Sequence, residues 1–200
     1  PYELTMPCRK MDRCELEQPK KSNSIYVITH DVAVSDAKNS DNACTHVIKL
    51  KEKPNGTFSK KVVYSKTVNG ISLNEQRDIL RELIHIKFPN TTKLIIDTMG
   101  SGAGLPSMFY ESWEYTDPKT KQVTEFPPII KDDDIEGQRL KGAIPLIRAI
   151  TATNSFNSEY YPYMKSCFED RSLELLLPSS EVDSDFKDNL LTVEEMSQHI

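Results

Sequence analysis

The 200-residue chain has no long apolar run, few cysteines and no excess of positive charge, and each absence excludes a class of protein. No stretch approaches the ~18 consecutive apolar residues that a membrane-spanning helix needs, so we expect no membrane contact. The formal net charge of −5 argues against a protein that coats nucleic acid by bulk charge, because such domains are usually basic. Contact with nucleic acid would therefore require a local basic groove.

The cysteine pattern also excludes common site types. The chain contains four cysteines, which are Cys8, Cys14, Cys44 and Cys167. They form neither a CxxC pair nor a Cys/His spacing typical of zinc sites, and no segment has the pattern of a signal peptide. The sequence therefore predicts free thiols in a reducing, cytosolic setting.

Three of the seven glycines lie in the segment LIIDTMGSGAG, residues 94–104. This segment lacks the Gly-Lys-Ser/Thr ending of a phosphate-binding loop, and its spacing differs from the dinucleotide pattern GxGxxG. A nucleotide cradle is therefore disfavoured. The simpler interpretation is a sharp turn out of a central strand near a crowded site, which only glycine and other small residues allow.

The apolar periodicity predicts an α+β fold with a mixed sheet of five strands flanked by helices. The expected strands are 24–35, 43–52, 57–68, 91–100 and 143–150, and the first three should form an antiparallel meander. The expected helices are 72–88, capped by Ser72 with Glu75, then 104–115, and one that begins at Asn157 or Ser158. Residues 1–24 read as a linker or strap, 115–142 as a long loop or excursion, and 172–178 as a short extended piece.

Two aspartates interrupt the most apolar strands. Asp31 is expected in the middle of its strand and Asp97 at the end of another. A carboxylate there is costly unless it is paired or binds a metal, and hard oxygen ligands suit Mg²⁺ or Mn²⁺. The alternatives are structural: Asp97 as a cap of the following turn, and Asp31 as partner of a lysine or arginine.

Three segments in this order resemble the nuclease domain of the large terminase subunit of tailed bacteriophages. They are YVITHDVAVSDAKNSDNA, then KLIIDTMGSGAG, then GAIPLIRAITATNSFNSEYYPYMKSCFEDRSLELLLP. The resemblance covers roughly residues 20–200. It implies a ribonuclease H-like fold, a mixed five-stranded sheet with helices on its faces, which agrees with the periodicity.

The resemblance also implies a site. Asp31 matches the first-strand acid and Asp97 the fourth-strand acid that together hold two divalent ions, Mg²⁺ or Mn²⁺, about 3.5–4 Å apart. The family's third acid comes from a late helix. Asp183, Asp185 and Asp188 lack that context, so we expect the third ligand to lie beyond Ile200.

The implied function is an endonuclease domain that cuts concatemeric duplex DNA at the start and end of genome packaging, in the cytoplasm of an infected bacterium. Residues 1–24 would connect to an ATPase domain of the same polypeptide, and 25–200 would form the nuclease domain. The implied partners are double-stranded DNA, the small terminase subunit and the portal protein.

Two other classes stay open. The first is a non-catalytic docking module of the packaging motor with the same fold. The second is a lobe of an actin-like ATPase, which the absence of a glycine-rich turn directly after Asp31 disfavours.

Individual side chains support these hypotheses less directly. The candidates to line a basic groove are Lys38, Lys60, Lys61, Lys131, Arg139, Lys141 and Arg148. We interpret Trp113 as helix packing, and His30 and His46 as sheet residues rather than ligands. His30 should point to the sheet face opposite that of Asp31.

Overall fold

A computed structural model describes residues 9–11, 24–34 and 42–176. The strands are β1 (Arg9–Met11), β2 (Ile25–Asp31), β3 (Ala43–Glu52), β4 (Phe58–Val68), β5 (Thr91–Asp97), β6 (Trp113–Thr116), β7 (Val123–Phe126), β8 (Ile129–Lys131), β9 (Ile144–Ile150) and β10 (Leu173–Leu176). The α-helices are α2 (Leu73–Glu82) and α3 (Asn154–Glu169). Most of the predicted linker lies outside the described residues.

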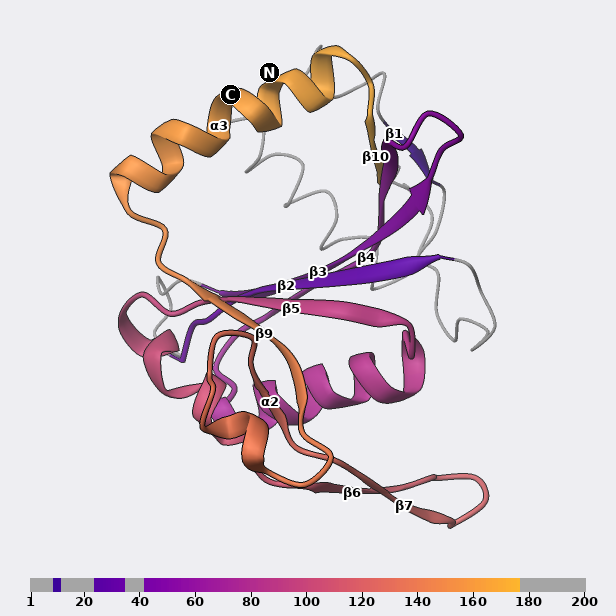
Figure 1. Ribbon diagram of the computed structural model, residues 1–200, viewed down its shortest axis with the longest axis vertical. Coiled ribbons are helices and arrows are strands. Elements are labelled where there is room, and N and C mark those ends of the chain that lie inside the picture. The colour runs from indigo at the N-terminus through magenta and orange to yellow at the C-terminus, as the bar shows by residue number, and fades with distance from the viewer. Residues whose placement is uncertain (1–8, 12–23, 35–41, 177–200) are drawn as a thin grey trace.

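The strands form one mixed sheet in the order β1-β10-β4-β3-β2-β5-β9-β8, with β6 and β7 as a separate hairpin. The pairs β2–β3 and β3–β4 are antiparallel, whereas β2–β5, β5–β9 and β8–β9 are parallel. Figure 1 shows α2 on one side of this sheet, α3 on the other, and the β6–β7 hairpin projecting from the α2 side. The architecture is thus α+β with a mixed sheet, as the periodicity predicted.

The expected antiparallel meander is confirmed. Its second connection is the turn at Lys53–Gly56, where the Gly56 amide donates to the Lys53 carbonyl at 2.9 Å and Gly56 has φ +76°. This left-handed conformation favours glycine and lets the chain reverse within a few residues. β5 and β9 then extend the meander on its other side in parallel, so the five expected strands lie next to one another.

The expected number of strands was too small. β8 and the β6–β7 hairpin lie within or overlap 115–142, which the sequence left as a loop or excursion. On the other side of the sheet β10 pairs with β4, and β1 lies outside β10. These strands have only three or four residues each. So short a run has no measurable period of two, and its pairing depends on neighbours distant in sequence.

The core lies between the sheet and α2. Alternate residues of β2, such as Tyr26 and Ile28, are fully buried on this face, where Tyr26 contacts the ring of Phe88 at a centroid distance of 5.1 Å. The capping box at Ser72 and Glu75 is present as predicted, with the Glu75 amide donating to Ser72 Oγ and the Ser72 amide donating to Glu75 Oε2. The helix continues from Glu82 as a π-helical turn to Lys87.

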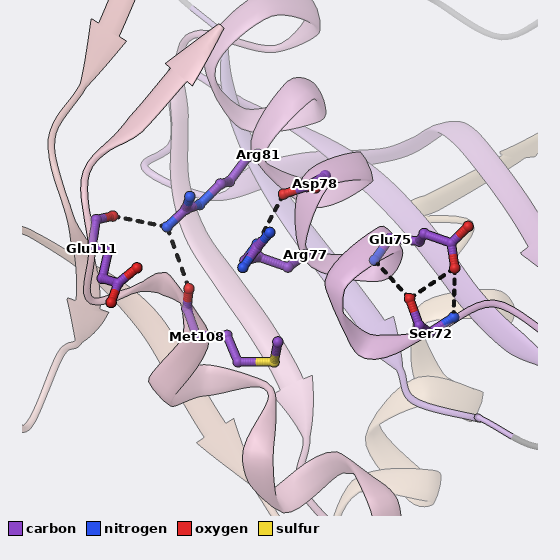
Figure 2. Close-up of polar contacts among 7 residues, drawn as sticks. All are labelled: Ser72, Glu75, Arg77, Asp78, Arg81, Met108 and Glu111. Atoms are coloured by element: carbon purple, nitrogen blue, oxygen red, sulfur yellow. Dashed lines mark hydrogen bonds and ion pairs between the residues drawn. The ribbon is translucent and has the colours of Figure 1, made fainter.

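Arg81 joins α2 to the segment before β6, as Figure 2 shows. Its side chain is buried, and its Nη2 donates to the carbonyl oxygens of Glu111 at 2.8 Å and Met108 at 3.4 Å. The guanidinium carbon lies 5.5 Å from the ring centroid of Phe109. Hydrogen bonds and the aromatic ring together replace the water that a buried cation loses.

Two helix predictions were wrong in detail. Residues 104–115 do not form one helix, because short 3₁₀ turns at Gly100–Gly104 and Pro106–Phe109 lead directly into β6. Trp113 accordingly lies in a strand and stacks near Phe126 and His85. α3 begins earlier than expected, because Thr153 is its N-cap and accepts a hydrogen bond from the Phe156 amide at 3.2 Å.

Within the described part of the chain, neither α-helix has the length and apolarity required to cross a bilayer.

Candidate functional site

Asp31 and Asp97 end two adjacent parallel strands. In the pairing of β2 with β5, Thr29 is opposite Ile95 and His30 is opposite Ile96, so each aspartate comes one residue after the last matched pair. Neighbouring strands lie ~4.8 Å apart, and residues in register on them point to the same face. The structure therefore brings the two predicted site residues side by side at one edge of the sheet.

The prediction that Asp31 lies in the middle of its strand was wrong. Asp31 is the last residue of β2 and is exposed, rather than lying within the strand. Apolar residues follow it, but a run of apolar residues does not reveal where its strand stops pairing. The cost of burial is thus no argument for a metal ion here. What argues for one is the proximity of two like charges.

A pocket of about 270 Å³ opens at these strand ends. It is lined by Thr29, His30, Asp31, Cys44, His46, Ile95, Asp97 and Ile150. The strand register explains why all of these residues except His30 share one face, because Cys44 is opposite Asp31 and His46 is opposite Thr29, while Ile150 is beside Asp97. The pocket floor is therefore the sheet face that α2 does not cover.

The glycine-rich turn shapes one side of the site. Asp97 Oδ1 accepts a hydrogen bond from the Met99 amide at 2.9 Å, so part of the alternative interpretation, a turn cap, is confirmed. Gly102 packs so closely against the carbonyl oxygen of Asp97 that a Cβ at this position would overlap it. The same Cβ would lie 3.4 Å from Cβ of Val32, the residue after Asp31. Glycine is thus required where the turn approaches the end of β5.

His30 lies on the opposite face, as predicted. It is buried, and its Nε2 lies 2.9 Å from Gln76 Oε1 on α2. Gln76 uses its amide nitrogen to donate to the carbonyl of Ala33 at 2.7 Å, so its oxygen accepts from His30. Burial lowers the pKa of His30, which leaves Nδ1 as acceptor for Thr45 Oγ1 at 2.9 Å. Gln76 thereby ties both His30 of β2 and the segment after Asp31 to α2.

The sequence did not single out Gln76 for this role. A polar residue on the apolar side of an amphipathic helix is a usable signal for a buried hydrogen-bond partner.

His46 and Cys44 form the β3 side of the pocket. His46 Nδ1 lies 2.9 Å from Ser65 Oγ, and its Nε2 lies 3.3 Å from Cys44 Sγ. Burial, assisted by the nearby His30, lowers the pKa of His46 from 6.5 to about 4. His46 is therefore neutral at pH 7, so it adds no positive charge beside the carboxylates.

This pKa predicts a pH dependence of stability. Because His46 binds its proton more weakly in the folded chain, its contribution is complete above pH 6.5 and is lost as the pH falls toward about 4. We expect the wild-type chain to lose up to about 2 kcal/mol of unfolding free energy from this group between pH 7 and pH 5. Urea denaturation at both pH values, on wild type and His46→Gln, measures it as a difference. Equal pH dependence in both proteins would contradict it.

The donor set suits a hard divalent cation in part. Asp31 and Asp97 supply carboxylate oxygens, which Mg²⁺ and Mn²⁺ prefer. Among the residues that the structure describes, no group of three or more His, Cys, Asp or Glu side chains could together hold a metal ion. The two carboxylates are therefore a partial ligand set, and the expected third ligand, along with Asp183, Asp185 and Asp188, lies outside the described residues.

Those basic candidates that fall in the described ranges do not form one groove. Arg148 lies on the pocket's sheet face, opposite Ile95 on β5. Lys60 and Lys61 lie on β4 near β10, where Lys61 pairs with Glu174 at 2.6 Å. Lys131 and Arg139 belong to β8 and the turn after it. Lys38 lies in a range that is not described.

The chain matches no protein-family model, and no curated protein is significantly similar to it.

Proposed function

We propose that this chain is a divalent-metal-dependent endonuclease domain with a ribonuclease H-like fold. The observation that carries the proposal is the register of Asp31 and Asp97, which end adjacent parallel strands on the sheet face left open by α2. Two carboxylates this close repel unless a cation lies between them, and phosphodiester hydrolysis is a reaction that such cations promote.

The arrangement of the central strands supports the fold assignment. β4, β3 and β2 form an antiparallel meander, β5 and β9 follow in parallel, and helices lie on both sides. These five strands are the ones that the periodicity predicted. In this proposal, β8, β10, β1 and the β6–β7 hairpin are additions around the five-stranded centre.

The residues of the site have distinct roles in the proposed reaction. Asp31 and Asp97 would hold the ions, and bound metal would activate the attacking water and stabilise the leaving oxygen. The Met99 amide orients Asp97, and the close approach of Gly102 leaves no room for a side chain between the turn and the end of β5. Neutral His46 leaves the negative charge available for cations.

The biological setting follows from the resemblance alone. We propose a nuclease of the large terminase subunit that cuts concatemeric duplex DNA in the cytoplasm of an infected bacterium. The proposed partners are an ATPase domain in the same polypeptide, the small terminase subunit and the portal protein.

One observation favours a second candidate, a non-catalytic docking module with the same fold. The described residues offer two carboxylates at the site and no third acidic, histidine or cysteine ligand grouped with them. A module that has lost its chemistry would retain the sheet and the glycine turn without needing the metals.

Cleavage of supercoiled plasmid separates the two candidates. We expect nicking and linearisation with Mn²⁺ and none with EDTA, because the two carboxylates need the ions to act on a phosphodiester. Failure of a folded chain to cut under Mn²⁺, also when extended past Ile200, would favour the docking module.

A further inference from the structure

A second charged cluster lies on the same sheet face as the candidate site, the face opposite α2. Asp132, the residue after β8, forms an ion pair with Lys93 on β5, whose Nζ lies 2.8 Å from Asp132 Oδ2. On the other side, Nη1 of Arg148 on β9 lies 3.6 Å from Asp132 Oδ1. The Asp132 amide also donates to the Ile147 carbonyl at 2.8 Å, which anchors the backbone at Asp132 to β9. The cluster contains two cations and one anion and therefore carries a net positive charge.

Lys93 and Arg148 are held differently. The hydrogen bond from Lys93, against the opposing effect of burial, keeps the pKa of Asp132 below its ordinary value, so one cation already balances the carboxylate. Arg148 is 57% exposed, and its contact with Asp132 is longer than a hydrogen bond, while Asp132 Oδ1 is buried without a hydrogen-bond partner. An exposed, loosely paired arginine contributes little to stability, so its guanidinium is available for a ligand.

Arg148 lies at a useful distance from the carboxylates. It is two residues before Ile150, and Ile150 is the register partner of Asp97. Two strand residues span ~7 Å, which corresponds to the rise of about two base pairs along the axis of B-DNA. A planar guanidinium with several N–H donors matches the geometry of a phosphate group.

We propose that Arg148, oriented by Asp132 and supported by Lys93, binds a backbone phosphate of the nucleic acid whose scissile bond lies at Asp31 and Asp97. This inference rests on the proposed nuclease function, and it assigns the path of the cleaved strand: from the carboxylates backward along β5 and β9. The contact is to phosphate, so it positions the strand without reading its sequence.

Binding measured in EDTA tests the contact separately from cleavage. The probe is a fluorescently labelled DNA duplex, titrated at several salt concentrations with wild type, Arg148→Gln, Arg148→Lys and Arg171→Gln. Arg171 is a matched control, because it is an exposed arginine before β10, which β4, β3, β2 and β5 separate from β9.

Arg148→Gln should weaken binding about 10-fold near 0.1 M salt and reduce the slope of log K against log salt by ~0.9, the value for one lost phosphate contact. Arg148→Lys should keep the wild-type salt slope and bind DNA more tightly than Arg148→Gln but less tightly than wild type. Lysine retains the positive charge but lacks the planar set of N–H donors. Arg171→Gln should bind like wild type.

The outcomes separate this inference from the proposed function. Equal affinities and slopes for Arg148→Gln and Arg171→Gln, or no binding by the wild type, would overturn the phosphate contact. If the Arg148 effect is present but wild type never cuts plasmid with Mn²⁺, the phosphate contact stands and the nuclease proposal fails. If wild type cuts and Arg148→Gln binds normally, the nuclease stands and this inference fails.

Discussion

Replacing either Asp31 or Asp97 by asparagine should abolish Mn²⁺-dependent plasmid cleavage while leaving the chain folded. Each change removes one negative charge and keeps the size of the side chain, so the metal ions lose a charged ligand but the strand ends keep their packing. We expect a loss of at least ~100-fold in rate, the scale seen when one group that stabilises developing charge is removed. Initial rates of nicking measure the loss of cleavage, and the melting temperature of each variant shows whether the chain stays folded.

Neither substitution should lower the stability of the chain by much. Asp97 accepts the Met99 amide at 2.9 Å, and an asparagine oxygen can still accept it, so we expect only a small change there. Removing the repulsion between the paired carboxylates should make either variant equally stable or slightly more stable without metal.

Glu125→Gln provides the matched control for these variants. Glu125 is an exposed carboxylate on the projecting β6–β7 hairpin, so losing its charge should leave the rate unchanged. Cleavage by Asp31→Asn at the rate of Glu125→Gln would remove Asp31 from the mechanism.

Gly102→Ala should damage both stability and cleavage. The added methyl group would overlap the carbonyl oxygen of Asp97, so the turn, the end of β5 or both must move. Forcing one extra carbon into a packed site costs about 1–3 kcal/mol. Because the displaced residue is Asp97 itself, the cleavage rate should fall as well. Urea denaturation and nicking rates on the same preparations measure the two effects.

Gly104→Ala is the control that distinguishes the steric overlap at Gly102 from the general effect of replacing a glycine in this turn. Gly104 belongs to the same turn, but a Cβ there would lie 3.9 Å from Leu73 Cδ1, an ordinary contact. This variant should stay within about 0.5 kcal/mol of wild type. If both alanine variants behave alike, the close approach of Gly102 to Asp97 is not what places glycine in this turn.

The sequence predicted the centre of the fold well because those elements have local signals. β2, β3, β4, β5 and β9 carry runs of alternating or continuous apolar residues, and α2 carries both an amphipathic stripe and the capping box at Ser72 and Glu75. The start of α3 was misplaced because Asn157 and Ser158 are equally good capping residues, and the choice of Thr153 depends on where β9 ends.

The candidate site, like the fold, was predicted from the sequence only in part. Sequence patterns singled out Asp31, Asp97 and the glycine turn, because an acid within or at the end of an apolar run is conspicuous. They could not predict that Gln76 holds His30, that Cys44 and His46 line the pocket, or that Asp132 faces Arg148. Each of these contacts joins residues on different strands or on a strand and a helix.

The sequence by itself determined the composition of the central strands, the capped helix α2 and the pair of aspartates, because periodicity and capping act within a few residues of chain. Only the tertiary structure decided that β2 and β5 pair in parallel with Asp31 and Asp97 in register, and that Gly102 folds back against Asp97. Strand register depends on contacts between residues that are far apart in the chain, which no local pattern encodes.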